Sequence, residues 1–397
     1  MRRVVTGERP DWRARAAAAG FTFHSFDGDP YWDEGAHYAF TLEEIESGIE
    51  APAAELHALC LDFAAAAVKD EAILRSLAIP EGAWDAITES WRRRDPSLYG
   101  RLDLAYDGVG PAKLLEYNAD TPTALYESAV FQWLWLEDGL AAGRLPAGTD
   151  QFNAVHEALI ARFRAVAPKG SPEGSPKGQP ARIAFTCMAD APEDRGTVAY
   201  LQDCAHQAGL PTAFVPLEGL GVDGAGAFVD AVDAPVDVLF KLYPWEWVFR
   251  DPFGAGIAGS PTRFLEPPWK ALLSNKGLLA HLWRLAPGHP NLLPAFFEDD
   301  PGKAALGASF AKKPLYSREG ANVLLVRDGA VLERRDGGYG AEGHVRQALA
   351  ELPAFDGRHA LVGCWMVGDE PKGLCVRESE ARITTDRARF VPHVIAP

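Results

Sequence analysis

The sequence predicts a mixed α/β or α+β fold, because stretches with helical apolar spacing are interspersed with short apolar runs typical of strands. Helical spacing is clearest at residues 53–69, 123–143, 151–166 and 195–208. Strands are predicted at residues 112–117, 182–188, 211–216, 236–243, 309–314, 322–327, 359–367 and 373–378. The 397 residues are 47% hydrophobic and 24% charged, a composition typical of a globular protein with a sizeable core.

Composition and element order divide the chain into three expected parts. Residues 1–170 form an N-terminal part that runs into PKGSPEGSPKGQP at 168–180, a segment expected to be a flexible linker or surface loop. Residues 181–260 begin with a strand, a helix and a strand, which is the order of a βαβ subdomain. Residues 261–397 are rich in strands and include a hairpin signal at Asp328-Gly329.

The charge balance narrows the class of partner. With 55 acidic and 39 basic side chains the formal net charge is -16, which disfavours nucleic acid or an anionic membrane surface as main partner. Local Lys and Arg side chains can still bind an anionic nucleotide, because screening limits the remaining field to about 10 Å. The five cysteines lack CxxC or metal-like spacing, and no apolar run marks a signal peptide or a membrane helix. We therefore expect a cytoplasmic protein without a membrane partner.

Oxygen-bearing side chains mark the ends of two neighbouring strands. In YGRLDLAYDG, Arg101 and Asp103 share one face of a strand, because side chains alternate with a period of two. The turn that follows predicts a hairpin, which brings Glu116 and Asn118 of KLLEYNADTPT towards Asp103. Two carboxylates and an amide oxygen are hard ligands that suit Mg²⁺ shared with nucleotide phosphates. The alternative is a solvated strand end with Asx turns at Asn118 and Asp120.

A basic group in the C-terminal part predicts a site for nucleotide phosphates. Lys276 lies in WKALLSNKG, and Lys313 lies in FAKKPLYSREGANV, whose loop carries Ser317 and Gly320. A strand lysine beside a small, hydroxyl-bearing loop can hold a nucleotide tail, although no Walker GxxxxGK[ST] sequence occurs. Arg377 follows a later strand and can stabilise charge on a transferring phosphoryl group. The alternative for Lys313 is a solvated surface residue.

The stretch YPWEW surrounds Glu246 with aromatic side chains. A carboxylate among aromatic rings suits a cationic amine. The alternative is an aromatic core with Glu246 at its edge. The ten histidines form no paired metal spacing such as HExxH, which argues against a zinc enzyme.

Together these stretches resemble the C-terminal synthetase domain of the glutathionylspermidine synthase family and its stand-alone bacterial relatives, which are ATP-grasp amide ligases. The resemblance rests on YGRLDLAYDG, LLEYNADTPT, FKLYPWEW, EPPWKALLSNKGLL, PGHPNLLPAFF, KKPLYSREGAN and RFVPHVI, in the family's order from about residue 20 to 395. It implies an ATP-grasp fold with an inserted or preceding βαβ-type pre-ATP-grasp subdomain. It also implies a reaction in which ATP phosphorylates a peptide-like carboxylate and an amine then attacks the acyl phosphate to give an amide.

The resemblance implies roles for the residues around the hairpin. Asp103, Glu116 and Asn118 fall where the family holds Mg²⁺. Arg101 falls on the family's catalytic, substrate-binding arginine, and Arg377 matches an arginine of a mobile loop that reaches the transferring group.

Further implied roles concern ATP and the acid. Lys276 and Lys313 match lysines on the ATP phosphates, and the family's late nucleotide lysine has no clear counterpart near residues 384–385. Thr121 and Thr123 stand where the family has serines near its thiol-peptide substrate, with Pro122 between them. We expect substrate identity to be decided at these two threonines.

The expected function is an ATP- and Mg²⁺-dependent carboxylate–amine ligase that joins a peptide-like acid, such as glutathione, to a polyamine. The alternative is a non-catalytic relative that binds nucleotide or polyamine and regulates a neighbouring pathway, and a weaker third idea is a phosphotransferase. No N-terminal cysteine-histidine amidase domain is expected, because the chain starts close to the synthetase region. The sequence carries no signal for the oligomeric state or for the identity of the acid and the amine.

Overall fold

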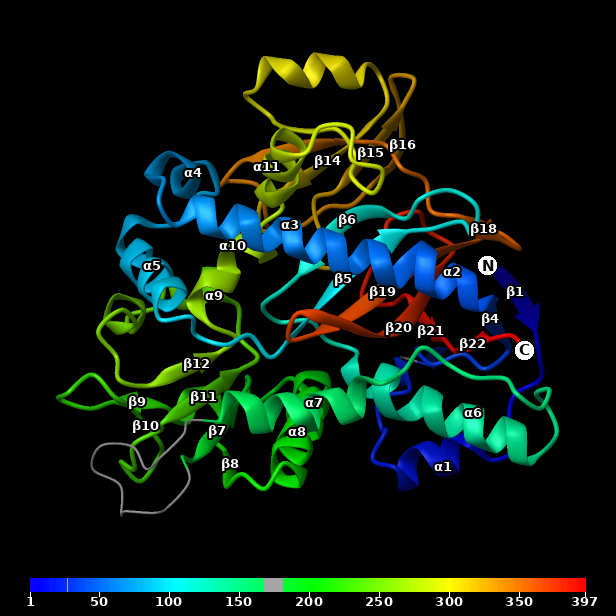
Figure 1. Cartoon of the computed structure of the whole chain (residues 1–397), viewed down its shortest axis with the longest axis horizontal. Helices are drawn as coiled ribbons and strands as arrows, with labels where there is room; N and C mark the ends of the chain where they lie inside the picture. Colours follow the sequence, from blue (N-terminus) through cyan, green and yellow to red (C-terminus); the bar gives the residue numbers. More distant parts are fainter. Residues whose placement is uncertain (27, 168–180) are drawn as a thin grey trace.

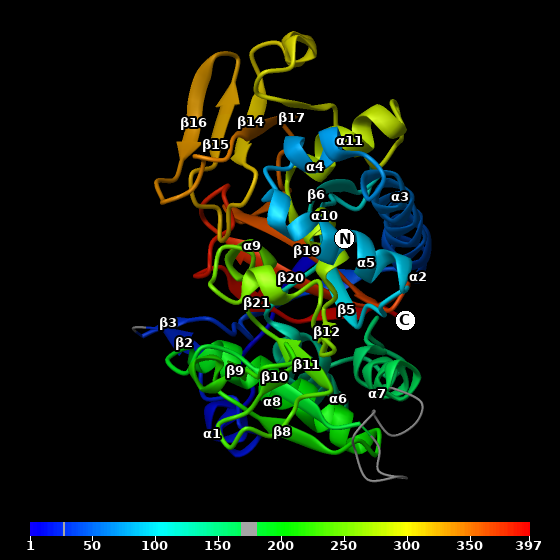
Figure 2. The ribbon, with the colours of Figure 1, turned by 90° about the vertical axis from the view of Figure 1, so that its left-hand side faces the viewer.

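The structure, a computed structural model, is a mixed α/β fold built from several sheets, which confirms that part of the predicted fold class (Figure 1). It describes residues 1–26, 28–167 and 181–397, so the predicted linker at 168–180 lies outside the described residues. Turned on its side, the molecule shows three tiers, with strands β14 to β16 in one, β5, β19 and β20 in the next, and β8 and β11 in the third (Figure 2).

The middle tier is an antiparallel sheet in the order β21-β20-β19-β5-β6, with β18 paired to β19. Its strands are β5 (Tyr99–Ala105), β6 (Lys113–Asn118), β18 (Ala354–Phe355), β19 (Arg358–Val367), β20 (Glu370–Ser379) and β21 (Arg389–Val391). The predicted hairpin is confirmed, because β5 pairs with β6 and sets Asp103 opposite Glu116 and Arg101 opposite Asn118. Strands from both ends of the chain therefore share the sheet that carries the predicted metal site.

The lower tier is a parallel sheet in the order β12-β11-β7-β8. Its strands are β7 (Ile183–Thr186), β8 (Thr212–Phe214), β11 (Val238–Lys241) and β12 (Arg263–Leu265). Helix α8 (Pro192–Gln207) connects β7 to its parallel neighbour β8, so the predicted strand-helix-strand unit is confirmed. Crossover helices of this kind cover a parallel sheet and leave its strand ends free to carry polar groups.

The upper tier is an antiparallel sheet in the order β13-β17-β14-β15-β16. Its strands are β13 (Ala295–Phe297), β14 (Phe310–Pro314), β15 (Leu324–Arg327), β16 (Ala330–Arg334) and β17 (His344–Ala348). Asp328 and Gly329 join β15 to β16 with φ angles of 50° and 79°. A two-residue hairpin turn needs positive φ at both positions, which Asp-Gly supplies, so this predicted turn is confirmed.

The first and last strands of the chain flank β4 in a further, mixed three-stranded sheet. Strand β4 (Ala36–Phe40) pairs with β1 (Arg2–Val5) on one side and with β22 (His393–Ile395) on the other. Short two-stranded pairs are formed by β2 (Ser25–Phe26) with β3 (Asp29–Pro30) and by β9 (Gly221–Val222) with β10 (Phe228–Val229).

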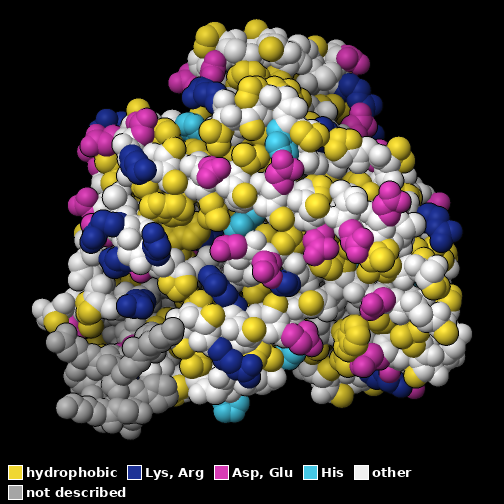
Figure 3. Space-filling view, in the orientation of Figure 1, with side chains coloured by type: hydrophobic (Ala, Val, Ile, Leu, Met, Phe, Trp, Pro, Cys, Tyr) yellow, Lys and Arg dark blue, Asp and Glu magenta, His cyan; other side chains and the backbone are white. Residues whose placement is uncertain are grey.

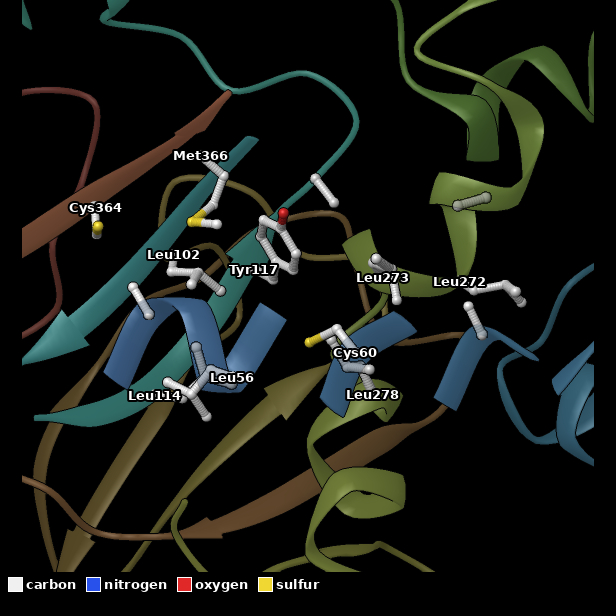
Figure 4. Packing of buried hydrophobic residues seen from close by; sticks show 14 of the residues in the cluster. Leu56, Cys60, Leu102, Leu114, Tyr117, Leu272, Leu273, Leu278, Cys364 and Met366 are labelled. Atoms are coloured by element: carbon white, nitrogen blue, oxygen red, sulfur yellow. The ribbon is translucent and has the colours of Figure 1, made fainter. Parts of the chain in front are cut away.

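Helix α3 (Ala51–Ala67) covers the middle tier. Its buried residues Leu56, Cys60 and Phe63 recur at helical spacing and form one apolar stripe. In the core, Leu56 and Cys60 lie with Leu102, Leu114 and Tyr117 of the hairpin and with Leu272, Leu273 and Leu278 of the next helices (Figure 4). Burying one such side chain stabilises the fold by about 1.5–3 kcal/mol, so this stripe anchors the hairpin from behind.

The remaining helices surround the three tiers. They are α1 (Trp12–Ala18), α2 (Leu42–Ile45), α4 (Glu71–Ser76), α5 (Trp84–Arg92), α6 (Gln132–Ala141), α7 (Val155–Val166), α9 (Trp245–Val248), α10 (Ala271–Ser274) and α11 (Gly277–Leu285). A π-helical turn, η3 (Glu127–Phe131), precedes α6, and another, η1 (Glu46–Glu50), precedes α3. Short 3-10 turns occur at η2 (Glu81–Ala83), η4 (Leu217–Gly219), η5 (Gly254–Gly256), η6 (Pro268–Lys270) and η7 (Pro301–Leu306).

Helix boundaries differ most from the prediction where residues at a helix end contact the backbone of a distant segment. The helix predicted from residue 151 begins at Val155, because Asn153 bridges to Gly373 and Gln151 bonds to two backbone carbonyls. Across the described residues, no helix is both long and apolar enough to cross a membrane.

Candidate active site

One face of the β5–β6 hairpin carries four of the predicted site residues. Arg101 donates from Nε to Asp103 Oδ1 at 2.6 Å and from Nη2 to Oδ2 at 3.0 Å. The Asn118 amide donates to Asp103 Oδ2 at 3.0 Å and to Glu116 Oε1 at 3.2 Å. The structure therefore brings Arg101, Asp103, Glu116 and Asn118 together, as the alternation of side chains along paired strands predicts.

The two predicted lysines lie beside this face. Lys276 Nζ is 2.9 Å from Glu116 Oε2 and donates to the Ser317 carbonyl at 2.6 Å. Lys313 Nζ donates to the Leu115 carbonyl at 2.9 Å and to Gln347 Oε1 at 2.8 Å. Lys313 is only 8% exposed, so the alternative of a solvated surface lysine is wrong.

Burial and neighbouring charges shift the pKa values of this group. Burial lowers the pKa of Lys313 to about 8, against the attraction of Glu116. For Glu116, burial would raise the pKa, but the charges of Lys276 and Lys313 hold it well below its usual value. Glu116 is thus an anion at neutral pH, and Lys313 is a buried ammonium that an additional anion would stabilise.

Two cavities meet at the hairpin. The polar cavity, about 230 Å³, is lined by Arg101, Asn118, Thr121, Thr123, Asp194, Trp247, Arg318, Glu319 and Arg377, among others. The apolar cavity, about 110 Å³, is lined by Leu115, Lys276, Ala311, Lys313, Ser317, Val323, Leu325, Gln347 and Ile383, among others. Asp103, Glu116, Gly320, Leu361 and Thr384 line both cavities.

The apolar cavity lies between two sheets. Lys313 and Ala311 come from β14 and Leu325 from β15, whereas Glu116 comes from β6 and Leu361 from β19. Its apolar walls suit a flat base, and its lysines lie at the end where it meets the carboxylates. This is an arrangement that can hold a nucleotide with its phosphates towards Glu116.

The loop after β14 closes both cavities. Gly320 has a φ of 74°, and a Cβ there would lie 2.4 Å from Ile383 Cγ2 and 3.0 Å from the Thr384 carbonyl. Only glycine therefore allows this loop to lie against residues 383–384. Ser317 is buried, its carbonyl accepts from Lys276, and its hydroxyl has no hydrogen-bond partner in the described chain.

Arg377 lines the polar cavity from β20. Its Nη2 donates to the Thr385 carbonyl, and its guanidinium lies 5.4 Å from the centre of the Phe390 ring. Its Nε is buried without a hydrogen-bond partner among the described residues. Arg377 therefore retains a donor for a group that enters the cavity.

Arg318, which was not predicted as a site residue, contacts two of the predicted substrate residues. It donates from Nη1 to Thr121 Oγ1 at 2.9 Å and from Nη2 to Glu246 Oε1 at 2.9 Å. The Thr123 carbonyl accepts from Arg101 Nη1 at 2.9 Å. Thr121, Thr123 and Arg318 line the polar cavity, whereas Glu246 lies behind Arg318 and its neighbour Trp247 supplies the wall. In the sequence, the only indication that Arg318 belongs to the site was its position next to Ser317.

Asp120 has a structural partner that its sequence position did not indicate. Its Oδ1 lies 2.7 Å from Lys241 Nζ, and its Oδ2 accepts from the Trp245 backbone at 2.7 Å. Both side chains are buried, so the alternative of a solvated strand end is wrong at Asp120. The pair instead joins the end of β6 to the end of β11 and holds the wall of the polar cavity.

Carboxylates at the start of α8 form a second group that sequence reasoning missed. Asp194 and Glu319 line the polar cavity, and Glu193 precedes Asp194 in the first turn of the helix. Burial, with the charges of Glu127, Asp194, Glu319 and Asp386, raises the pKa of Glu193 to about 7. Burial chiefly raises the pKa of Asp194 to about 6. A cation in the cavity would relieve this repulsion.

The oxygen ligands present at the hairpin fit Mg²⁺. Within the described residues, no group of three or more His, Cys, Asp or Glu side chains is placed to hold a metal. At the hairpin the available oxygens are those of Asp103, Glu116 and the Asn118 amide, whose nitrogen donates to both carboxylates. These are the hard oxygen donors that Mg²⁺ takes when phosphates and water complete its shell. Asp103 and Glu116 also lie where the two cavities meet, so a metal there can touch groups from both.

Comparison with known proteins gives one family over almost the whole chain. Residues 3–396 match the model of the family described as glutathionylspermidine synthase preATP-grasp. A Haemophilus influenzae protein with the provisional name acid–amine ligase is 41% identical over 408 residues, covering 99% of each chain.

Two further relatives are larger than this chain. The Escherichia coli bifunctional glutathionylspermidine synthetase/amidase is 28% identical over 92% of this chain and 60% of its own length. Trypanothione synthetase of Crithidia fasciculata is 28% identical over 83% of this chain and 52% of its own length. The chain thus spans about half to three fifths of these two relatives.

Proposed function

Because the chain belongs to the glutathionylspermidine synthase preATP-grasp family, we propose that it is an ATP- and Mg²⁺-dependent ligase that joins a carboxylate to an amine through an acyl phosphate. The membership predicted from the sequence is confirmed, as is the prediction of an amide-forming enzyme related to named ligases and synthetases. The observation that carries the mechanism is the meeting of two unlike cavities at Asp103 and Glu116.

ATP occupies the apolar cavity between the upper and middle sheets, which is where an ATP-grasp fold holds its nucleotide. Lys313 and Lys276 bind the phosphates, exchanging their present backbone and carboxylate partners for phosphate oxygens. The burial of Lys313, which lowers its pKa to about 8, favours this exchange, because a phosphate anion stabilises its protonated form. The loop at Ser317 and Gly320 covers the phosphates with small residues.

Asp103, Glu116 and Asn118 would hold Mg²⁺, which would supply positive charge to offset the charge on the transferring phosphoryl group. Arg101 keeps Asp103 oriented through its paired contacts. Asn118 spaces the two carboxylates by donating to both. Asp103, Glu116 and Asn118 already lie together, and Lys276, now paired with Glu116, moves to the phosphates when the nucleotide binds.

The acid substrate lies in the polar cavity with its carboxylate between Arg101 and Arg377. Arg101 and Arg377 both line this cavity, Arg377 has a donor without a partner among the described residues, and the two side chains orient the carboxylate towards ATP. Thr121, Thr123 and Arg318 contact the rest of the acid. A peptide-like acid, with glutathione as one member of the class, suits this mixture of hydroxyl, guanidinium and backbone groups.

The amine enters at the carboxylate side of the same cavity. Asp194 and Glu319 line it there, and Glu193 and Asp386 add negative charge behind them. An ammonium group bound to Asp194 loses its proton to the Asp194 carboxylate, whose raised pKa of about 6 keeps it a usable base near neutral pH. The neutral amine then attacks the acyl carbon, the carbon–oxygen bond to phosphate breaks, and the departing phosphate takes the second proton of the nitrogen. A polyamine fits this group of several carboxylates better than a neutral nucleophile.

The five cysteines are all free and buried, which is in keeping with a cytoplasmic location as part of this proposal. The decisive experiment incubates purified protein with ATP, Mg²⁺ and a matrix of peptide acids against diamines and polyamines. We expect ADP and an amide product, detected by mass spectrometry, only when both substrates are present.

Other results of this substrate-pair assay would indicate one of the two alternative functions. ATP or amine binding without ADP release for any pair would point to the non-catalytic regulator. A stable phosphorylated product without amine would point to the phosphotransferase. Either result contradicts the ligase proposal. Trapping the acyl phosphate with hydroxylamine in the absence of amine tests the intermediate itself.

A further inference from the structure

A third cavity lies away from the two that meet at the hairpin. It occupies about 340 Å³ between the start of α6, the start of α7 and the middle of α8, and we call it the helix cavity. Its lining includes Tyr126, Trp133, His156, Glu157, Tyr200 and Asp203. Among the described residues, none of those that line it lines the polar or the apolar cavity.

Aromatic rings form the walls of the helix cavity. Tyr126 and Tyr200 meet edge to face, with ring centres 5.9 Å apart, and His156 stacks on Tyr200 at 5.8 Å. His156 Nδ1 and the Tyr200 hydroxyl are 3.0 Å apart, which holds both rings in position. Trp133 is 39% exposed, although a side chain of this size is usually more buried. Ring faces fixed around a hollow are the surfaces that attract cations.

The polar groups of the helix cavity are acceptors. Glu157 and Asp203 lie at its rim, and neither forms an ion pair with a Lys or Arg within the described part of the chain. Asp203 accepts only from the Gln207 amide, at 2.7 Å. Deeper in, Asn153 Oδ1 is buried and has no hydrogen-bond partner among described residues, since the Asn153 amide nitrogen donates to the Ala129 carbonyl. The lining contains no Lys or Arg.

We propose that the helix cavity is a binding site for an aliphatic ammonium ligand, such as a small diamine. One ammonium group lies against the aromatic rings and donates to Asn153 Oδ1, and the other lies between Glu157 and Asp203 at the rim. Methylene groups between them cover Val130 and Leu134. The aromatic faces, the unpaired carboxylates and the buried acceptor each favour a cation over a neutral or anionic ligand.

This site is separate from the amine position in the polar cavity and does not depend on the proposed reaction. The two are joined by α8, which carries Asp194 in its first turn and Tyr200 and Asp203 further along. In the space-filling view, apolar atoms and carboxylates gather together over α6 and the start of α7 (Figure 3).

The test is equilibrium dialysis of radiolabelled 1,4-diaminobutane against the full chain without ATP, which leaves the proposed reaction out of the measurement. The variant is Glu157→Gln with Asp203→Asn, and the matched control is Glu43→Gln with Asp62→Asn, two exposed carboxylates whose removal changes the net charge equally. We expect the variant to bind one diamine fewer per chain than the control. Equal binding by variant and control, including no binding by either, overturns the proposal.

A second variant protects the test against a loss of folding. Trp133→Leu changes a half-exposed side chain and retains the apolar character of the position. We expect it to weaken diamine binding at this site by about tenfold, because the ring face supplies part of the attraction. Unchanged affinity in Trp133→Leu overturns the assignment of the aromatic walls. Asp194→Asn should leave this binding intact, which separates the helix cavity from the amine position in the polar cavity.

Discussion

Glu116 and Lys276 form an ion pair with 2.9 Å between Oε2 and Nζ, which joins the predicted metal strand to the predicted ATP lysine before either ligand is present. Lys276 thus occupies the side of Glu116 that a metal and phosphates would share. We therefore expect this ion pair to break when the nucleotide and its metal bind.

We expect Glu116→Gln to lower kcat by about 100-fold or more, because the amide retains the shape of the side chain but not its charge. The Mg²⁺ concentration for half-maximal activity should also rise. The measurement is ADP release at several Mg²⁺ concentrations, with Glu43→Gln, an exposed change in α2, as control. A Glu116→Gln enzyme with unchanged Mg²⁺ dependence would remove Glu116 from the metal site.

We expect ATP binding to be accompanied by proton uptake at pH values near and above 8. Burial lowers the pKa of Lys313 to about 8, so part of the free protein carries a neutral Lys313 at pH 8.5. A bound phosphate favours the protonated lysine and raises its pKa again. Calorimetry in two buffers with different heats of ionisation measures the uptake. It should vanish in Lys313→Met and persist in Lys312→Met, the neighbouring strand residue.

We expect kcat/KM for the amine to rise as the pH passes through about 6. Burial raises the pKa of Asp194 to about 6, so Asp194 is protonated, and unable to accept a proton, below this value. Asp194→Asn should lose this step and lower kcat/KM by about 100-fold. Asp190→Asn, an exposed change two residues before α8, is the control. If the step survives in Asp194→Asn, another group is the base.

We expect Asp120→Asn to destabilise the fold by about 3–5 kcal/mol, because it leaves the buried Lys241 without a carboxylate. Asp120→Asn with Lys241→Met should recover part of the loss, since no unpaired charge remains. Urea unfolding measures both variants. Breaking the exposed Glu89–Arg92 pair by Glu89→Gln should leave the urea midpoint unchanged, and an equal shift there would contradict the buried-pair explanation.

Much of the site follows from local rules of the chain. The alternation of side chains along a strand placed Arg101 and Asp103 on one face, and a short turn was enough to predict that Glu116 and Asn118 would lie opposite. The strand-helix-strand order of the lower tier and the Asp328-Gly329 hairpin were predictable for the same reason. In each case the interacting groups are neighbours along the chain, across one turn or across one connecting helix.

The partners of these groups were decided by packing between distant segments. Arg318 reaches Thr121 across 197 positions and Glu246 across 72, and Asp120 reaches Lys241 across 121. Asp194 looked like an ordinary acidic residue in the first turn of a helix, and only the tertiary fold, which places the start of α8 at the polar cavity, revealed its position there.

The sequence alone was therefore sufficient for the family, the mixed fold class and the oxygen-bearing face of the hairpin, because motifs and alternation are local properties. Tertiary structure decided which charges neutralise one another, which lysines are buried and which carboxylates line the polar cavity. Those outcomes depend on distances of a few ångströms between segments brought together by the core, and spacing along the chain contains no such distances.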